Sequence, residues 1–414
     1  MKSSPRAANA GLLIFTGCLI GMLTFGPRST MGFFLTPIST EYEWNRDVFG
    51  FAIALQNLVW GMAQPFVGGL ADKFGARLVI AFGSIIYAAG LILMSVASDP
   101  VTLHLTAGLL IGLGISGSAF FLILSVFTKS LPAHIRPLAL GLGTASGSMG
   151  QFLFAPLGQA FIVNYGWQIA LVIMGVILLT VPFLVIGLRT SGKQLDAGVA
   201  MEKPDPRQNQ TVVQAIREAF SHTSFNLLVT GFFVCGFHLA FITVHLPPYL
   251  EDLGFDAKTG GWAIALIGLF NIVGAIVFGV ATGRFPKQYT LSFIYAARAV
   301  VIALFIFLPP SIWTVLAFAS GMGLLWLSTV PPTQSLVADM FGTRHLAMLF
   351  GFVFLSHQVG SFLGVLLGSI LYESTGNYDL IWQISIALGV LAALVHWPIK
   401  EEQVPVSQGE RIKV

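Results

Sequence analysis

Twelve runs of mostly apolar residues, each about 18 residues or longer, divide the chain into segments that can cross a bilayer as helices. They lie at about 11–36, 48–70, 78–98, 102–128, 138–162, 168–188, 225–250, 259–281, 290–308, 311–336, 346–371 and 380–397. Only 9% of the 414 residues are charged and 55% are hydrophobic, whereas a soluble domain has about 25% charged residues. The sequence therefore predicts an all-α membrane protein with twelve transmembrane helices.

The longest polar stretch, 189–224, separates six runs from six. Its first part has the composition of a flexible linker. Thr211–Phe225 has amphipathic spacing and is expected to lie along the membrane surface; its apolar residues are Val212, Val213, Ile216, Ala219 and Phe220. We expect an N-terminal six-helix bundle (1–188), a cytoplasmic linker with this helix (189–224), and a C-terminal bundle with a short cytoplasmic tail (225–414).

The distribution of basic residues predicts the orientation. Of the 21 Lys and Arg residues, 17 fall on the side of the N-terminus and only Arg46 and Lys258 on the other side. The positive-inside rule then places both termini in the cytoplasm and the chain in the cytoplasmic (inner) membrane. No predicted span contains Asp or Glu.

The two halves resemble each other at an offset of about 210 residues. GGLADKFGARL (68–78) aligns with GVATGRFPKQY (279–289), and RPLALGLG (136–143) aligns with RHLAMLFG (344–351). A duplicated six-helix unit is typical of transporters whose two pseudo-symmetric halves rock about a central site.

Arg28 is the one charge within the first run. An arginine at that depth costs ~2.5–3.5 kcal/mol on insertion scales, so it requires a function or a partner. Helical spacing places Arg28 on a stripe with Gly17, Gly21 and Gly32, a face suited to close helix contact. We expect Arg28 to face protein or a wet cavity, and Pro27 to kink the helix beside it.

Other polar residues within the spans have two interpretations each. Arg298 is either a second anion ligand or a structural arginine bonded to carbonyls of neighbouring helices, and we favour the structural role. A histidine is either a helix contact or a proton carrier, since it titrates near pH ~6.5. Gln151 and Asn271 are either hydrogen-bond partners of a substrate or contacts between helices. The histidines considered are His238, His357 and, nearer the outer surface, His245.

Several classes of function are not indicated. Cys18 and Cys235 both lie in apolar runs, so no disulfide framework is expected. The net charge of +3 is too small to suggest nucleic acid. We find no zinc-type spacing, nucleotide-binding motif or catalytic constellation, so we expect no metal, no cofactor and no enzyme activity.

The loop from Gly68 to Arg77 resembles the loop motif of the major facilitator superfamily. This resemblance implies a conformational latch between helices that separate during transport, with the candidate residues Gly68, Asp72, Lys73, Gly75 and Arg77. The second copy has Gly283 where the acid would be, so its latch should be weaker.

Within that superfamily, residues 20–95 resemble the monocarboxylate transporter family. Gly26-Pro27-Arg28-Ser29, followed by Phe33-Phe34, is similar to its first-helix stretch, and Phe74–Val79 is similar to the opening of its third helix. The resemblance places Arg28 where that family has the lysine that meets the substrate carboxylate. Asn271 and Ala275 stand where its animal members have an Asp and an Arg, which departs from their proton-coupling pattern.

The sequence thus predicts a secondary active transporter that acts as a monomer. We expect its substrate to be a small organic anion, and we favour a monocarboxylate. The candidate binding residues are Arg28, Gln151, His238, Asn271, Arg298 and His357. A coupled proton would ride on a histidine or on the substrate, and anion exchange without a proton is the alternative. Two other functions are an exporter of drugs or metabolites, disfavoured by the lack of an acid within the spans, and a membrane sensor that does not transport.

Overall fold

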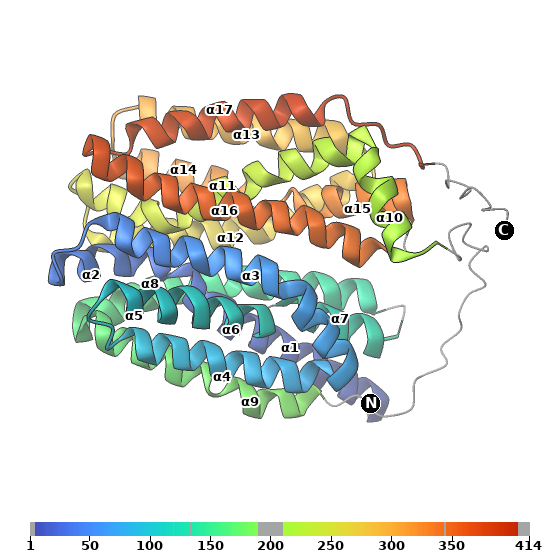
Figure 1. The fold of residues 1–414 in the computed structure, drawn as a ribbon, viewed down its shortest axis with the longest axis horizontal. Coiled ribbons are helices and arrows are strands. Elements are labelled where there is room, and N and C mark those ends of the chain that lie inside the picture. The colour runs from blue at the N-terminus through green and yellow to red at the C-terminus, as the bar shows by residue number, and fades with distance from the viewer. Residues whose placement is uncertain (1–4, 119, 133–134, 189–209, 343–344, 405–414) are drawn as a thin grey trace, which may run out of the picture.

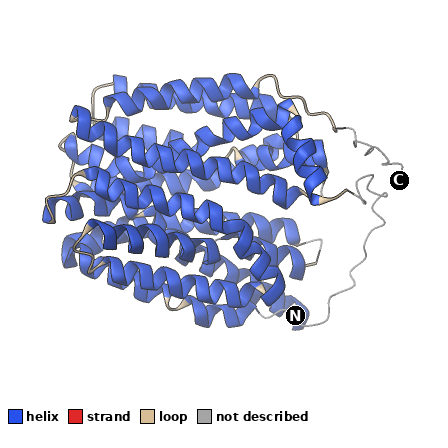
Figure 2. Cartoon of the chain, viewed as in Figure 1, coloured by secondary structure: helices blue, strands red, loops and turns tan. Residues whose placement is uncertain are grey.

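The computed structural model describes residues 5–118, 120–132, 135–188, 210–342 and 345–404 (Figure 1). Helices and the short loops between them account for all of these residues, and none of them lies in a strand (Figure 2). The start of helix α1, helix α10 and the segment after α17 all lie at the same end of the molecule. The first and last helices are at one end because the chain crosses the membrane an even number of times.

The first half of the chain contains six crossings. Their elements are α1 (Pro5–Ser29), η1 (Met31–Phe34), α2 (Leu35–Glu41), α3 (Arg46–Phe74), α4 (Ala76–Met94), α5 (Pro100–Leu103), η2 (His104–Leu110), α6 (Ile111–Ser118), α7 (Phe120–Ser130), α8 (Arg136–Leu178), α9 (Val181–Leu184) and η3 (Val185–Leu188). Helix α8 is interrupted by a turn at Gly166, where the backbone φ of 80° favours glycine. The fifth and sixth crossings therefore lie on either side of Gly166.

The second half repeats this arrangement after the amphipathic helix. Its elements are α10 (Val212–Ser221), α11 (Thr223–Asp252), α12 (Ala257–Thr282), α13 (Lys287–Phe307), α14 (Ile312–Leu325), α15 (Val330–Phe341), α16 (Leu346–Thr375) and α17 (Asp379–His396). Among the described residues, ten helical segments are long and apolar enough to span a membrane, and one of them, 138–188, contains the turn at Gly166. Helix α3, with 29 residues, adds the twelfth crossing, since about 20 residues suffice. The twelve-helix prediction is confirmed.

Each half buries its own hydrophobic core. Tyr87 and Phe127 are fully buried within the first bundle, whereas Tyr295 and Trp382 are fully buried within the second. The two bundles lie side by side, with α3 of the first beside α16 of the second (Figure 1). A site between the bundles is therefore lined by both halves of the chain.

Glycines on α3 show where the bundles touch. Gly50, Gly61 and Gly68 share one helical face because they are spaced by 11 and 7 residues. An added Cβ would lie 1.8 Å from Ser369 Oγ at Gly50 and 2.6 Å from Gln358 Cβ at Gly61, but would meet nothing within 4 Å at Gly68. The contact between α3 and α16 is thus tight near Arg46 and opens toward Gly75.

The other helix pair at the interface shows the same gradient. On α12, a Cβ at Gly268 would lie 2.9 Å from Phe152 N, whereas one at Gly279, on the same face, would meet nothing within 4 Å. Gly351 of α16 is equally unobstructed. We call the closed end, which contains Arg46, the gate end, and the parted end, which contains α10, the linker end.

The amphipathic segment forms helix α10, as predicted. Its N-terminus has a capping box, in which the Thr211 hydroxyl accepts from Gln214 N and the Gln214 side chain accepts from Thr211 N. Ala215 and Ala219 are buried, whereas the Val213 side chain is 73% exposed. The apolar residues thus divide between the protein and the face turned away from it.

Candidate substrate-binding site

The first crossing breaks beside Arg28. Helix α1 ends at Ser29, and a 3-10 helix follows from Met31. The hydroxyls of Ser29 and Thr30 donate to the carbonyls of Gly26 (2.6 Å) and Pro27 (2.7 Å). These bonds use carbonyls near the interruption, while Pro27 itself lies inside α1 and the kink expected there stays a prediction.

Arg28 faces protein, as expected. Its Nη2 donates to Asn57 Oδ1 at 3.0 Å, and its Cζ lies 4.6 Å from the centroid of the Trp60 ring. Asn57 is held in turn by a bond from its Nδ2 to Ile53 O (2.9 Å). Within the described part of the chain, no carboxylate forms an ion pair with Arg28. The guanidinium is therefore held by a neutral amide and keeps an uncompensated positive charge.

A small cavity lies against Arg28, between the two bundles. It offers about 10 Å³ to the centre of a water-sized sphere, and its lining residues are Arg28, Met31, Ile53, Gln56 and Asn57 from the first bundle and Ala240, Thr243 and Val244 from the second. Toward the gate end it is closed, because Gly32 packs so tightly that a Cβ would lie 2.4 Å from Thr243 O. The wall combines one cation, three uncharged polar side chains and an apolar surface.

Two chains of contacts connect Arg28 with His357 across the bundle interface. In the first, Gln358 Nε2 donates to the carbonyl of Asn57 (3.0 Å), and Gln358 Oε1 lies 3.0 Å from His357 Nδ1. In the second, the rings of Trp60 and Phe354 meet at 5.4 Å, and Phe354 stacks on His357 at 5.7 Å. The structure thus connects these two candidate residues through intermediates on α3 and α16.

The other two candidate histidines, His238 and His245, lie away from the cavity. His238 is fully buried, and its Nε2 lies 2.8 Å from the carbonyl of Ser385 on α17. His245 is also fully buried, near the gate end, between Tyr378 and the Val365 carbonyl. Of these three histidines, only His357 is near Arg28.

Gln151 and Asn271 lie at the contact between α8 and α12. Gln151 Nε2 donates to Ile264 O (3.2 Å), and Asn271 Nδ2 donates to Ser148 Oγ (2.8 Å). Both side chains are nearly inaccessible and bridge the bundles. Neither is among the residues that line the cavity at Arg28.

The tenth crossing is interrupted between α14 and α15, and the side chain of Arg298, on α13, contacts this interruption. Its Nε and Nη2 donate to the carbonyl of Leu325 (3.2 and 2.6 Å), and Nη2 also donates to Trp326 O. The amide of Leu327 donates to Asn271 Oδ1 (3.0 Å). Because a broken helix leaves polar backbone groups without intrahelical partners, these contacts fit the structural role of Arg298 and give Asn271 a role at the same interruption.

The candidate latch residues lie at the linker end. Gly75 joins α3 to α4 with a φ of 90°, which explains why the turn contains glycine. Lys73 and Arg77 are exposed, and Lys73 Nζ lies 5.2 Å from the Phe74 ring centroid. The side chain of Asp72 lies outside the described part, so its function as a latch stays a prediction.

The sequence did not single out Asn57, Trp60 or Gln358. The adjacent amides Gln56 and Asn57 within a predicted span were an available signal, because uncharged polar side chains there require partners. Gln358 follows the candidate His357 directly. Only the tertiary structure shows that Asn57 and Trp60 contact Arg28 and that Gln358 contacts Asn57.

Comparisons with known proteins give a family match over most of the chain. The family model described as Major Facilitator Superfamily matches residues 17–336 and 261–413. The chain is 26% identical over 405 residues to the "Uncharacterized MFS-type transporter YcxA" of Bacillus subtilis, covering 95% of this chain and 96% of that one. It is 24% identical to the "Monocarboxylate transporter 13" of Rattus norvegicus, with 95% and 90% covered.

The fold is also similar to a solved crystal structure. That protein is a bacterial homologue of the human lysosomal transporter Spinster, in an inward-facing and unoccupied conformation. The TM-score is 0.73, the identity is 15%, and 96% of this chain and 97% of that chain are covered. At this identity the comparison supports the fold alone.

Proposed function

The chain belongs to the Major Facilitator Superfamily, and from that premise we propose that it carries a small monocarboxylate across the membrane by alternating access. The observation that carries the proposal is Arg28, a cation at a cavity between the bundles with a neutral amide as its hydrogen-bond partner. A guanidinium can bind a carboxylate through two parallel hydrogen bonds. The match to a rat protein named as a monocarboxylate transporter supports the same class of substrate.

The surroundings of Arg28 favour one acidic group over two. Arg298, the other arginine within the spans, donates to backbone carbonyls in the second bundle. A second carboxylate would therefore find no cation among the residues that line the cavity. Met31, Ile53, Ala240 and Val244 offer apolar surface to a short carbon chain, and Gln56 and Thr243 offer polar groups to a hydroxyl or keto oxygen.

The asymmetry of the bundle contacts supports the transport cycle. The bundles meet at the gate end and part at the linker end, where a Cβ added at Gly68, Gly279 or Gly351 would meet no atom within 4 Å. With the linker in the cytoplasm, as the basic residues predict, this arrangement is inward-facing. The moving domains are then the bundles 1–188 and 225–414 in the inner membrane, the segment 189–224 connects them in the cytoplasm, and the monomer is the transporting unit.

Proton coupling through His357 is the finer part of the proposal. Gln358 donates its amide nitrogen to Asn57 O, so its oxygen accepts from His357 Nδ1–H. The second ring nitrogen then has a lone pair that can take a proton. His357 is 8% exposed, whereas His238 is fully inaccessible. Exchange of anions without a proton is the alternative.

The test is uptake by proteoliposomes that contain the purified protein. Radiolabelled acetate, pyruvate and lactate are compared with succinate and with choline, at pH ~6 and ~7.5. We expect saturable uptake of at least one monocarboxylate, faster at the lower external pH, with protein-free liposomes as the control. Uptake of choline or succinate without any monocarboxylate would contradict the assignment.

A further inference from the structure

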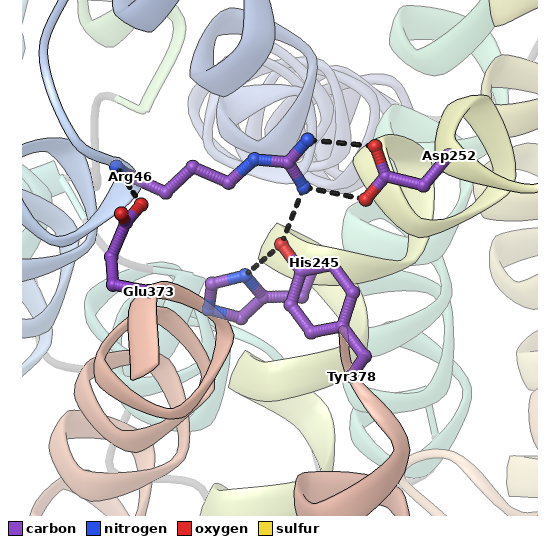
Figure 3. Close-up of polar contacts among 5 residues, drawn as sticks. All are labelled: Arg46, His245, Asp252, Glu373 and Tyr378. Atoms are coloured by element: carbon purple, nitrogen blue, oxygen red, sulfur yellow. Dashed lines mark hydrogen bonds and ion pairs between the residues drawn. The ribbon is translucent and has the colours of Figure 1, made fainter. Parts of the chain in front are cut away.

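A network of charged and aromatic side chains closes the gate end (Figure 3). Arg46, the first residue of α3, donates from Nη2 to Asp252 Oδ1 (2.7 Å) and from Nη1 to Asp252 Oδ2 (2.8 Å). Its Nη1 also donates to the hydroxyl of Tyr378 (3.0 Å), and its guanidinium lies 3.9 Å from the centroid of the Tyr372 ring. Two parallel bonds to one carboxylate are a strong form of ion pair.

Every one of these partners comes from the other bundle. Asp252 ends α11, Tyr372 and Glu373 lie near the end of α16, and Tyr378 precedes α17. Even the backbone amide of Arg46, at the N-terminus of α3, donates to the Glu373 carboxylate at 2.6 Å. Movement of the bundles apart at this end would therefore break all of these contacts together.

The hydroxyl of Tyr378 connects the network to His245. His245 Nε2 lies 2.9 Å from the carbonyl of Val365, which can only accept, so Nε2 holds the proton. The other nitrogen, Nδ1, lies 3.2 Å from Tyr378 Oη and must then accept the phenol proton. The phenol oxygen is left to accept from Arg46. Burial raises the pKa of the Tyr378 phenol, which keeps that proton in place.

This pattern of hydrogen bonds requires a neutral His245. A proton on Nδ1 would place two donors, His245 and Arg46, on one phenol oxygen and a second positive charge beside the guanidinium. Asp252 is already engaged with Arg46. The charged and titratable groups at the gate end of the elements around His245 are Arg46 and Asp47 of α3, Tyr372 and Glu373 of α16, Tyr378 and Asp379 beside and in α17, and Tyr249, Glu251 and Asp252 of α11.

We propose that His245 is a proton-binding site built into the outer gate, where a neutral imidazole holds the Arg46–Asp252 latch closed and a proton releases it. Since the latch parts only as the bundles rock, this rests on the alternating access proposed above. A proton binds His245 more tightly when the gate is parted than when it is closed. This difference in proton affinity shifts the equilibrium between the two states toward the parted one. Acid on the outer side therefore favours the outward-facing state.

The experiment measures gate opening without any substrate. Cys18 and Cys235 are replaced by serine, and Ser369→Cys serves as the reporter. Ser369 is fully inaccessible at the contact with Gly50, and its hydroxyl has no hydrogen-bond partner in the described structure, so its replacement by a thiol breaks no hydrogen bond. Right-side-out vesicles are labelled with a membrane-impermeant maleimide, and rates are divided by those in SDS at the same pH.

The first comparison tests the latch. Asp252→Asn should label roughly two- to fivefold faster than the parent, the range that loss of a partly exposed ion pair gives. Asp379→Asn, an exposed acid at the same end, is the control and should match the parent. Gly351→Cys, labelled at the linker end in inverted vesicles, should react more slowly when Asp252→Asn is added. Equal rates for Asp252→Asn and Asp379→Asn would overturn the latch.

The second comparison tests the proton. In the parent, Ser369→Cys should label faster at pH ~5.5 than at pH ~8 once corrected, because an imidazole that reaches water in the parted state titrates in that interval. His245→Gln and Tyr378→Phe should each flatten this dependence. His104→Gln should leave it unchanged, since His104 bonds the Val48 carbonyl within the first bundle. A dependence that survives both gate variants would overturn the proton site. Gate responses as expected, with no carboxylate transported, would instead leave the gate standing and refute the proposed substrate.

Discussion

Arg28 Nη2 lies 3.0 Å from Oδ1 of Asn57, so the one arginine at the cavity is held by an uncharged partner. Asn57 is itself fixed by the Ile53 carbonyl and is only 3% exposed. An amide orients a guanidinium without neutralising it, whereas a carboxylate would do both. This pairing leaves the charge of Arg28 available to an anionic substrate.

Asn57→Asp should therefore inhibit transport strongly. The new carboxylate would pair with Arg28 and compete with the substrate, and we expect the rate of uptake to fall by roughly tenfold or more, as ~1.4 kcal/mol of competition gives. The measurement is the rate of substrate uptake by Asn57→Asp and by the parent at matched expression. Asn164→Asp is the control, because Asn164 makes the same bond to the carbonyl four residues earlier but is exposed. Normal uptake by Asn57→Asp would argue against an anion at Arg28.

Arg298→Gln should destabilise the protein without changing substrate recognition. It removes donors from the carbonyls of Leu325 and Trp326, and each buried group left unpaired costs about 1–3 kcal/mol. We expect a lower Tm in detergent and an unchanged KM. Arg284→Gln, at an exposed arginine after α12, should leave both unchanged. A normal Tm with a KM raised about tenfold would make Arg298 a ligand instead.

Asp72→Asn should slow the transport cycle more than it weakens binding. The motif around Gly75 lies at the linker end, away from the cavity at Arg28. A latch there changes the populations of the two states without contacting the substrate. Binding followed by thermal shift should stay within about threefold of the parent, while the maximal rate falls. Loss of binding at a normal maximal rate would contradict this role.

His357→Gln should flatten the pH dependence of uptake yet leave exchange at constant pH nearly unchanged. Glutamine keeps a hydrogen-bonding side chain but cannot carry a proton near pH ~6.5. His238→Gln is the matched control, because His238 faces Ser385 inside the second bundle. If His357→Gln keeps the parent profile, the protein is better described as an anion exchanger.

The sequence predicted those features that depend on local pattern. The apolar runs predicted the positions of the crossings. The amphipathic spacing after Thr211 predicted helix α10. The tenth apolar run, 311–336, predicts one continuous helix, whereas a second helix begins there at Val330, followed by Pro331 and Pro332. Sequence could not decide between ligand and structural roles for Arg298 and Asn271, because a backbone carbonyl and a substrate oxygen accept the same bonds.

The sequence also missed contacts that join distant helices. Asn57 meets Gln358 across 301 positions, and Arg46 meets Asp252 across 206. The sequence predicts for Arg46 only that it is one of two basic residues on the side opposite the N-terminus. Its partner depends on how the bundles approach at the gate end, which hydropathy and spacing do not contain.

The most direct test of the account is uptake by Arg28→Ala and Arg28→Lys in proteoliposomes, for a monocarboxylate that the parent transports. Arg28→Ala should insert and fold like the parent but transport at the level of protein-free liposomes, because the cavity then has no cation for the carboxylate. Arg28→Lys should retain part of the rate, since an ammonium attracts the anion without the second parallel bond. Full uptake by Arg28→Ala at matched expression would contradict the central claim.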